Sequence, residues 1–371
     1  MKQHISGASL NDNKMKKLSW IEITSLYIGV IMGAGFASGR ECWQFFGVFG
    51  HKGYFGAIAS TVCFVLIACM LTFIARSKNT ADLGKLISPF DNRYIDEIIG
   101  WILAIIYYSM IIAMTAAGGS LLNQQFGISK AFGGIIIALL CIITVLGDFE
   151  RVSKVFRLLV PVLFIVGIIT ILLTIHADFG QSGATEGYQP GRMSPNWFIS
   201  AVVFMAYNTT GMITMAGNSA VNASSGRNAY AGAVMGTLCL GTLTILLLRA
   251  LLTDMAFSSA LDLPMLGFSG RISPVLNAIY AVVLYGAVYS TGASTYYGFS
   301  TKLPVGKVKR IIIVSGAAAG FLLGLTGFKK LVEFLYPAQG YIGIIFIILI
   351  IINFAKEFHA ALCSSRQTTV N

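Results

Sequence analysis

The sequence predicts an all-α polytopic membrane protein with ten transmembrane helices, arranged as a 5+5 inverted repeat in which helices 1 and 6 are unwound at mid-membrane. Three observations predict this fold. The chain is 56% hydrophobic and 11% charged, whereas soluble proteins carry roughly 25% charged residues. Apolar runs of about 20 residues, enough to cross a bilayer, recur along the chain. Two of these runs are interrupted by glycines and polar residues at corresponding places in the two halves.

The apolar runs divide the chain into two repeats flanked by polar tails. We expect a disordered cytoplasmic tail at 1–17, a first five-helix repeat at 18–175, a second at 195–355 and a cytoplasmic tail at 356–371. The predicted spans are, in order, 18–47, 53–75, 96–123, 131–147, 156–175, 195–222, 228–256, 272–300, 309–327 and 331–355.

The lysines and arginines predict the orientation. They gather in the N-terminal tail and in the connections 76–95, 148–155 and 301–308, which all lie on one side if the chain has ten spans. Since positive residues favour the cytoplasmic side, we expect a plasma-membrane protein with both termini in the cytoplasm. The net charge of +11 then reflects loops that face anionic lipid. We therefore expect the lipid bilayer as a partner and no nucleic acid.

Each half opens with a long, interrupted span. The first, 18–47, is broken near Met32–Gly39, and the second, 195–222, is broken near Met205–Met212. An odd number of spans per half makes the two halves run in opposite directions. Unwinding a helix inside a bilayer leaves peptide groups unpaired, at several kcal/mol each unless a ligand, an ion or water binds them. Matched breaks of this kind indicate the binding site of a transporter.

The residues at the breaks suit exposed backbone. Gly33, Gly35 and Gly39 lower the steric penalty of unwinding, and Asn208–Thr210 supply side-chain partners for backbone groups. The helix start near Ser38–Gly39 would attract an anionic group, and the helix end near Gly33 would offer carbonyls to a cation. In the alternative interpretation these glycines serve only close helix packing.

Two stretches carry a resemblance to known proteins. "GAGFASGRE" at 33–41 and "AYNTTG" at 206–211 resemble the YkvI-like family of largely uncharacterised bacterial membrane proteins, and this resemblance covers the chain from about residue 15. More distantly, the ten-span plan is similar to the leucine-transporter (LeuT-like) fold of the amino acid–polyamine–organocation superfamily.

The resemblance to the LeuT-like fold implies a central site formed by spans 1, 3, 6 and 8, and a small solute such as an amino acid, often carried with sodium. Tyr107 and Tyr108 fall near the middle of span 3, and only one of them can face the site, because helical neighbours point about 100° apart. The candidate substrate-binding residues are Gly33, Ala34, Gly35, Phe36, Tyr107, Tyr108, Tyr207, Asn208, Thr209, Thr210 and Gly211.

The same resemblance implies a sodium site. Ser290 and Thr291 on span 8 would complete it with carbonyls of Val30 and Gly33 on span 1. Alternatively, each hydroxyl bonds a carbonyl of its own helix. Phe36 stands where sodium-dependent relatives often carry asparagine, so a second sodium ion is not expected. No other cofactor is expected, and the coupling ion stays open between sodium, a proton and none.

Charged residues follow the first break. Arg40 and Glu41 are expected toward the outside, where Arg40 would pair with Glu333 at the start of span 10 to form an outer gate. The alternative is that both side chains extend to the outer interface. No intramembrane carboxylate near the midplane is obvious from the sequence.

These features predict a secondary active transporter of a small solute, an amino acid or a related zwitterion or amine, working by alternating access with sodium as the candidate coupling ion. A nutrient sensor that binds the same ligands without net transport is the alternative. No grouping of His, Asp and Ser or of metal ligands indicates an enzyme. Since the LeuT-like fold often works as a monomer, we expect a monomer.

Overall fold

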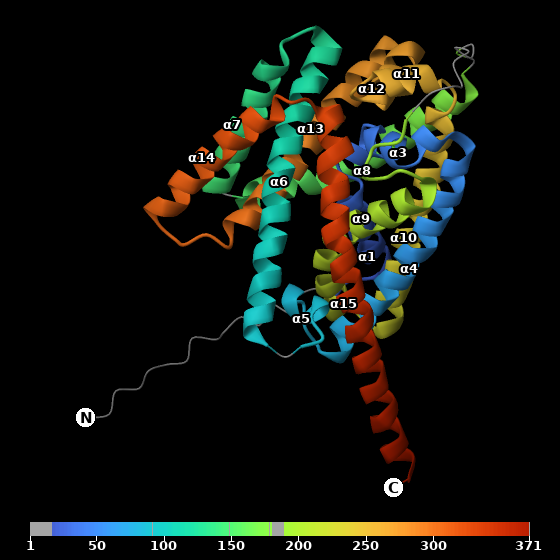
Figure 1. The fold of residues 1–371 in the computed structure, drawn as a ribbon, viewed down its shortest axis with the longest axis vertical. Coiled ribbons are helices and arrows are strands. Elements are labelled where there is room, and N and C mark those ends of the chain that lie inside the picture. Colours follow the sequence, from blue (N-terminus) through green and yellow to red (C-terminus); the bar gives the residue numbers. More distant parts are fainter. Residues whose placement is uncertain (1–16, 91, 148, 178, 180–188, 371) are drawn as a thin grey trace.

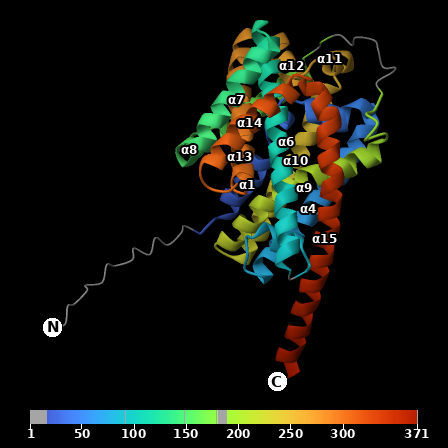
Figure 2. The same ribbon diagram turned by 60° about the vertical axis from the view of Figure 1, so that its left-hand side comes forward.

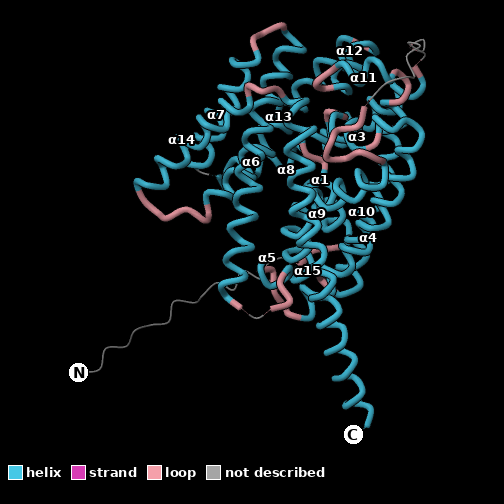
Figure 3. The backbone as a smooth tube through the Cα atoms, in the orientation of Figure 1, coloured by secondary structure: helices cyan, strands magenta, loops and turns pink. Residues whose placement is uncertain are grey.

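The computed structural model describes residues 17–370 except 91, 148, 178 and 180–188. Within these residues the chain is helical, and its extended pairing is limited to an isolated bridge between Leu18 and Ala223. Figure 3 shows the helices joined by short loops. Residues 1–16 of the predicted disordered tail at 1–17 lie outside the described residues.

The helices follow the order of the predicted spans, with short extra helices between them. Their bounds are α1 (Trp20–Ile31), α2 (Ala34–Ala37), α3 (Arg40–Phe45), η1 (Gly47–Lys52), α4 (Gly53–Ser77), α5 (Leu83–Ile87), α6 (Arg93–Phe126), α7 (Lys130–Leu146), α8 (Phe149–His176), α9 (Trp197–Asn222), α10 (Gly226–Leu251), α11 (Met255–Ala260), α12 (Pro264–Ile272), α13 (Pro274–Ser300), α14 (Lys307–Gly324) and α15 (Phe328–Val370).

The chain is a multi-pass membrane protein by the length and composition of its helices. Among the described residues, six segments are long and apolar enough to cross a bilayer: the stretch of η1 and α4, and the helices α6, α9, α10, α13 and α15. Shorter apolar helices, α1, α7 and the 161–176 part of α8, occupy three further predicted spans. The 18-residue α14 fills the remaining range, and α2 and α3 continue the first span beyond its break. The count of ten spans remains a prediction.

The predicted break in the first span is present. Ser19 caps the start of α1, where its hydroxyl accepts a hydrogen bond from the Glu22 backbone and the Glu22 carboxylate accepts one in return. The helix ends at Ile31, after which Met32 and Gly33 leave helical geometry. Gly39 has φ +81°, which favours glycine. A Cβ on Gly39 would also lie 2.8 Å from Met265 Cγ, so both conformation and space select glycine here.

The predicted break in the second half is wrong for this structure, because α9 is a continuous helix through Met205–Met212. The polar side chains bond within the helix. Asn208 Nδ2 donates to the Phe204 carbonyl, and the hydroxyls of Thr209 and Thr210 donate to carbonyls of Met205 and Tyr207. Each side chain thus donates its hydrogen bond to a carbonyl of its own helix, and no peptide group has to leave the helix to accept it.

The helices that hold the site pack around α1 and α9. The helix α1 lies against both α9 and α10, α4 lies against α9 and α10, and α6 lies against α13. The contacts of α4 with α9 and of α1 with α10 are equivalent if the two halves are exchanged. This is the pairing that a five-helix repeat would give, and the repeat itself remains a prediction.

Aromatic packing fixes α3 against α9. The Phe204 ring of α9 lies 5.3 Å from Phe45, 4.8 Å from Phe46 and 6.0 Å from Phe64, measured between ring centroids. Rings at these spacings and tilts attract one another beyond the area they bury. The cluster therefore holds the short α3 in place although it has fewer than two helical turns.

The two ends of the molecule differ. The end of the molecule that carries α5 and the C-terminal part of α15 in Figure 1 is here called the terminal face. The opposite end, here called the capped face, carries α11 and α12. These two short helices cover α3 and the break in the first span, so the site lies beneath them.

A candidate solute cavity at the break in the first span

A cavity of about 850 Å³ runs from the break in the first span toward the terminal face. Its walls come from α1, α2, α3, α6, α9 and α13, with single residues from α8 and α15. Ile21 and Ser294 at its outer rim are exposed, whereas Ala34 and Glu41 at its inner end are buried. The cavity therefore opens at the terminal face and ends blindly below the capped face.

The inner end of the cavity is shaped by two glycines of the break. A Cβ on Gly33 would lie 3.4 Å from Thr291 Oγ1, so α13 approaches the exposed backbone closely. A Cβ on Gly35 would lie only 1.9 Å from Glu41 Oε1. Because no real Cβ tolerates that distance, Gly35 is what allows the Glu41 carboxylate to lie over the break.

The position of Glu41 corrects the sequence analysis. Glu41 was expected in an outer gate with Arg40 and Glu333, and not among the residues that line the binding site. In the structure Glu41 is 3% exposed, lines the cavity, and accepts a hydrogen bond of 3.3 Å from the Tyr207 hydroxyl. The left-handed turn at Gly39 redirects the chain, so that α3 returns its carboxylate to the cavity.

The predicted ion pair of Arg40 with Glu333 is not formed among the described residues. Arg40 is buried, and its Nη1 donates to the carbonyls of Ser259, at 3.4 Å, and Leu261, at 3.2 Å. Ser259 lies in the last turn of α11, and Leu261 directly follows that helix. The carboxylates of Asp262 and Glu333 lie near enough for long-range attraction only. Arg40 thus holds the cap in place through backbone acceptors.

Other charged groups fasten the same segment. Asp262, which follows Leu261, accepts hydrogen bonds from Ser120 of α6, at 2.8 Å, and from Lys130 of α7, at 2.5 Å. Lys329 of α15 donates to the Ser259 carbonyl at 2.8 Å. Met265 N–H of α12 donates to the Ser38 carbonyl at the break, at 3.0 Å. The capped face is therefore tied to α3, α6, α7 and α15.

The Asp262 contacts predict that closure of the capped face is insensitive to mild acid. Burial raises the pKa of Asp262, but the hydrogen bonds from Lys130 and Ser120 outweigh it, so the pKa lies below its ordinary value. The ionised form then stabilises the closed cap at every pH above about 3.9, and the stabilisation is lost only as the pH falls through the lowered pKa.

We expect thiol labelling of Leu266→Cys, a buried position of the cap helix α12, to stay constant between about pH 5 and pH 8 once corrected for the reactivity of a free thiol. The background lacks the six native cysteines. Asp262→Asn serves as the control in which labelling rises at every pH. A labelling rate that climbs toward pH 5 in the parent would contradict this account.

Most predicted substrate-binding residues meet in the cavity. Phe36, Tyr108 and Thr209 do not line it: Phe36 and Thr209 are buried in packing, and the Tyr108 hydroxyl donates to the Gly316 carbonyl of α14. Tyr107 is the neighbour on α6 that faces the site. The predicted residues that line the cavity are Gly33, Ala34, Gly35, Tyr107, Tyr207, Asn208, Thr210 and Gly211.

The four residues predicted for sodium also line the cavity. Val30 and Gly33 lie at the end of α1, and Ser290 and Thr291 face them from α13. Ser290 donates its hydroxyl to the Ala287 carbonyl of its own helix, whereas Thr291 Oγ1 lies beside Gly33. The predicted partners are thus neighbours. Occupation by sodium remains a proposal.

Several lining residues were missed by the sequence analysis. Gln339 of α15 reaches the cavity, donates to Ser109 Oγ at 2.6 Å, and leaves its Oε1 buried without a protein partner among the described residues. Met110 and Met114 add a flexible apolar wall from α6. A glutamine inside an apolar span was the available signal for Gln339, because such side chains are costly in a bilayer.

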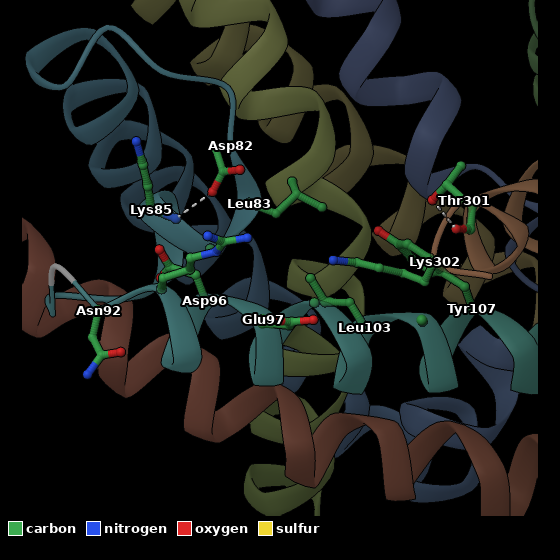
Figure 4. A pocket seen from close by; sticks show the side chains of 15 residues that line it. Asp82, Leu83, Lys85, Asn92, Asp96, Glu97, Leu103, Tyr107, Thr301 and Lys302 are labelled. Atoms are coloured by element: carbon green, nitrogen blue, oxygen red, sulfur yellow. Dashed lines mark hydrogen bonds between the residues drawn. The ribbon is translucent and has the colours of Figure 1, made fainter. Parts of the chain in front are cut away.

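A second cavity of about 700 Å³ adjoins the first at the terminal face. Figure 4 shows its charged lining, with Asp96 and Glu97 on α6 and Lys302 reaching across from the end of α13. Tyr107 and Gly298 line both cavities, and a Cβ on Gly298 would lie 3.1 Å from the Tyr107 ring. The Tyr107 ring therefore forms the partition between the two spaces.

Comparisons with known proteins agree with the expected resemblance. No family model matches the chain. It is 26% identical over 342 residues to the uncharacterized membrane protein YkvI of Bacillus subtilis (strain 168), covering 90% of this chain and 96% of that protein. It is 23% identical to the uncharacterized protein YyaD of the same organism, covering 88% and 94%. The resemblance to YkvI-like membrane proteins is confirmed.

Solved structures of similar fold support the predicted architecture. The inward-facing conformation of Mhp1 superposes with a TM-score of 0.60 at 11% identity, covering 95% of this chain and 81% of that one. An Eremococcus coleocola manganese transporter in complex with an aromatic bis-isothiourea substituted compound superposes at 0.51 with 15% identity, covering 95% and 90%. The chain thus shares the LeuT-like fold with these proteins.

Proposed function

We propose that this protein is a secondary active transporter that carries a small amine-containing solute, an amino acid or a related amine, by alternating access. The observation that carries the proposal is the cavity that ends at the broken first span and opens at one face only. A site that is reachable from one side at a time is the requirement of alternating access. The LeuT-like fold supports the same function by analogy.

The conformation corresponds to the inward-open state if both termini are cytoplasmic, as the positive charges predict. The terminal face is then the cytoplasmic face, and α11 with α12 closes the outer side. Release of solute would occur through the rim at Ile21 and Ser294. In the outward-open state, Arg40 would have to leave the carbonyls of Ser259 and Leu261.

If Thr291 and Gly33 form a cation site together, sodium is the candidate coupling ion. Neighbouring hydroxyls and the carbonyls of an interrupted helix are suitable hard ligands for such an ion. Uptake into proteoliposomes is measured under a sodium gradient, under a pH gradient and under neither. The comparison distinguishes sodium coupling, proton coupling and uncoupled transport. Loss of sodium dependence alone in Thr291→Val would assign the ion to this position.

A sensor that binds the solute without transport is the second candidate. Counterflow separates the two functions, because a transporter exchanges labelled for unlabelled solute across a sealed membrane and a sensor does not. A screen of the twenty amino acids and small amines by thermal shift would first identify a ligand. Binding without counterflow in proteoliposomes would overturn transport and leave the sensor.

Gly35→Leu is expected to abolish ligand stabilisation. Any side chain on Gly35 displaces the Glu41 carboxylate, because its Cβ would lie 1.9 Å from Oε1. We expect the thermal shift produced by a saturating ligand to disappear. Gly226→Ala is the control, since its Cβ would meet the Arg76 side chain at an ordinary 3.4 Å. A folded Gly35→Leu variant that still responds to ligand would argue against this cavity as the site.

A further inference from the structure

The cavity has an unbalanced charge. Its described lining contains two carboxylates, Glu22 at the rim and Glu41 at the inner end, and no lysine, arginine or histidine. Glu22 caps α1 at the terminal face, which leaves Glu41 as the acidic group within the binding region. A cavity of this composition suits a positively charged ligand.

The surroundings of Glu41 supply hydrogen bonding but no compensating cation among the described residues. Tyr207 of α9 donates its hydroxyl to Oε1, and the Tyr336 ring of α15 stacks on Tyr207 at 4.8 Å between centroids. Cys42 is the neighbour on α3 and gives its thiol to the Thr244 carbonyl of α10. No described lysine or arginine lies within ion-pair distance of Glu41.

Two arginines on α3 and on the neighbouring α10 face groups other than Glu41. Arg40 directs its guanidinium to the carbonyls of Ser259 and Leu261. Arg249, at the capped end of α10, lies beside Tyr54. Neither arginine therefore offsets the charge of Glu41 by direct contact.

Elementary electrostatics restricts what Glu41 can do. An ionised carboxylate that is removed from water without a counter-charge costs several kcal/mol. The carboxyl group must therefore hold a proton, or meet a cation that arrives through the cavity. An ionisable group inside a membrane protein is by default a functional group, and here it lies at the end of the path that leads from the terminal face.

We propose that Glu41 binds a proton and the ammonium group of a cationic amine alternately, so that the protein exchanges protons for amines. The proposal rests on the proposed function and deepens it by naming the substrate class and the coupling. When the amine R–NH₃⁺ arrives, the O–H bond of the Glu41 carboxyl group breaks, the carboxylate pairs with the ammonium group, and the proton leaves to the water of the cavity. Charge is conserved in this exchange.

The rest of the lining selects amines over zwitterions. A zwitterion would bring a carboxylate that finds no cationic side chain in the described lining. The apolar part of an amine would instead meet Met110, Met114 and the rings of Tyr107 and Tyr207, which line the same space. Aromatic faces also attract the ammonium group itself. The preferred solute is thus a monocationic amine with an apolar body.

Direct proton counting tests the proposal. Phenethylamine is added to the purified protein in weakly buffered solution with a pH dye, and 2-phenylethanol and phenylacetate serve as neutral and anionic probes of similar size. We expect phenethylamine alone to bind and to release close to one proton per site. Amine binding without proton release, or equal binding of the alcohol, would overturn the exchange.

Variants assign the proton to Glu41. Glu41→Gln keeps the size of the side chain and an acceptor for Tyr207, and is expected to weaken phenethylamine binding roughly 10- to 100-fold, with no proton release. Tyr207→Phe removes one hydrogen bond and is expected to weaken binding about 3- to 10-fold with release intact. Glu357→Gln, a carboxylate beside Lys78 at the terminal face, is the control that behaves as the parent.

A chemical measurement on the parent protein covers the case in which Glu41→Gln does not fold. A hydrophobic carbodiimide reacts with protonated carboxyl groups away from water, and mass spectrometry locates the product. We expect modification at Glu41 and protection by phenethylamine. Modification that the amine does not slow would contradict a shared site.

The outcomes separate this inference from the proposed function. If a solute from the screen undergoes counterflow equally in the parent and in folded Glu41→Gln, transport stands and proton–amine exchange fails. If phenethylamine releases a proton from Glu41 without counterflow, the exchange site stands and transport fails.

Discussion

Arg40→Met is expected to open the capped face. The substitution keeps the length of the side chain but removes the donor that Nη1 supplies to the carbonyls of Ser259 and Leu261. A hydrogen bond from a charged group contributes about 1.5–3 kcal/mol, and the two long contacts count as one bond because they share the single nitrogen Nη1. The equilibrium between closed and open caps should therefore shift roughly 10- to 100-fold toward the open state.

The labelling rate of Leu266→Cys measures that shift, since this position is 1% exposed under the closed cap. Arg249→Met is the matched control, because Arg249 lies near the same end of the molecule but is exposed and forms no hydrogen bond or ion pair with the described residues of α11 and α12. An unchanged rate in Arg40→Met, or an equal rise in the control, would show that other contacts keep the cap closed.

Gly39→Ala is expected to lower the stability of the protein through both its backbone conformation and its packing. The left-handed backbone at φ +81° costs an alanine roughly 1–2 kcal/mol. The added Cβ would also lie 2.8 Å from Met265 Cγ, and overpacking of this kind costs about 1–3 kcal/mol. A thermal melt of the purified protein in detergent should show a clear decrease in midpoint.

A comparison within the same chain separates the two contributions. Gly127 has a similar left-handed conformation, φ +69°, but open space where its Cβ would be, so Gly127→Ala measures the backbone cost alone. Met265→Ala combined with Gly39→Ala should recover the packing part. If Gly39→Ala is no worse than Gly127→Ala, the contact with α12 does not hold the break.

The sequence predicted the first break because its determinants are local. Gly33 and Gly39 are required by a chain that leaves helical geometry and then turns through a left-handed residue. The prediction of a second break was wrong because the same polar side chains can form their hydrogen bonds in two ways. Asn208 and Thr209 can bond a freed backbone or the carbonyls of an intact helix, and the intact helix is what the structure has.

The role of Glu41 could not be predicted from periodicity. Its direction depends on the turn at Gly39 and on the space that Gly35 leaves, and both are properties of the folded break. Likewise, Arg40 found partners among backbone carbonyls, which no pattern of charged residues can indicate. By contrast, the location of Tyr107 followed from helical geometry, since one of two adjacent tyrosines had to face the site.

The continuity of α9 makes the two halves mechanically unequal. Rotation is cheapest at Gly33, whose N–H bonds the Ile31 carbonyl and so interrupts the helical ladder that ends with the bond from Met32 to Ile28. The helix α1 can therefore rotate about this break, whereas the continuous α9 can tilt only as one rigid helix. Because Leu18 N–H and its carbonyl are bonded to Asn222 and Ser224, rotation of α1 pulls on the C-terminal end of α9. We therefore expect α1 to move first and α9 to follow it.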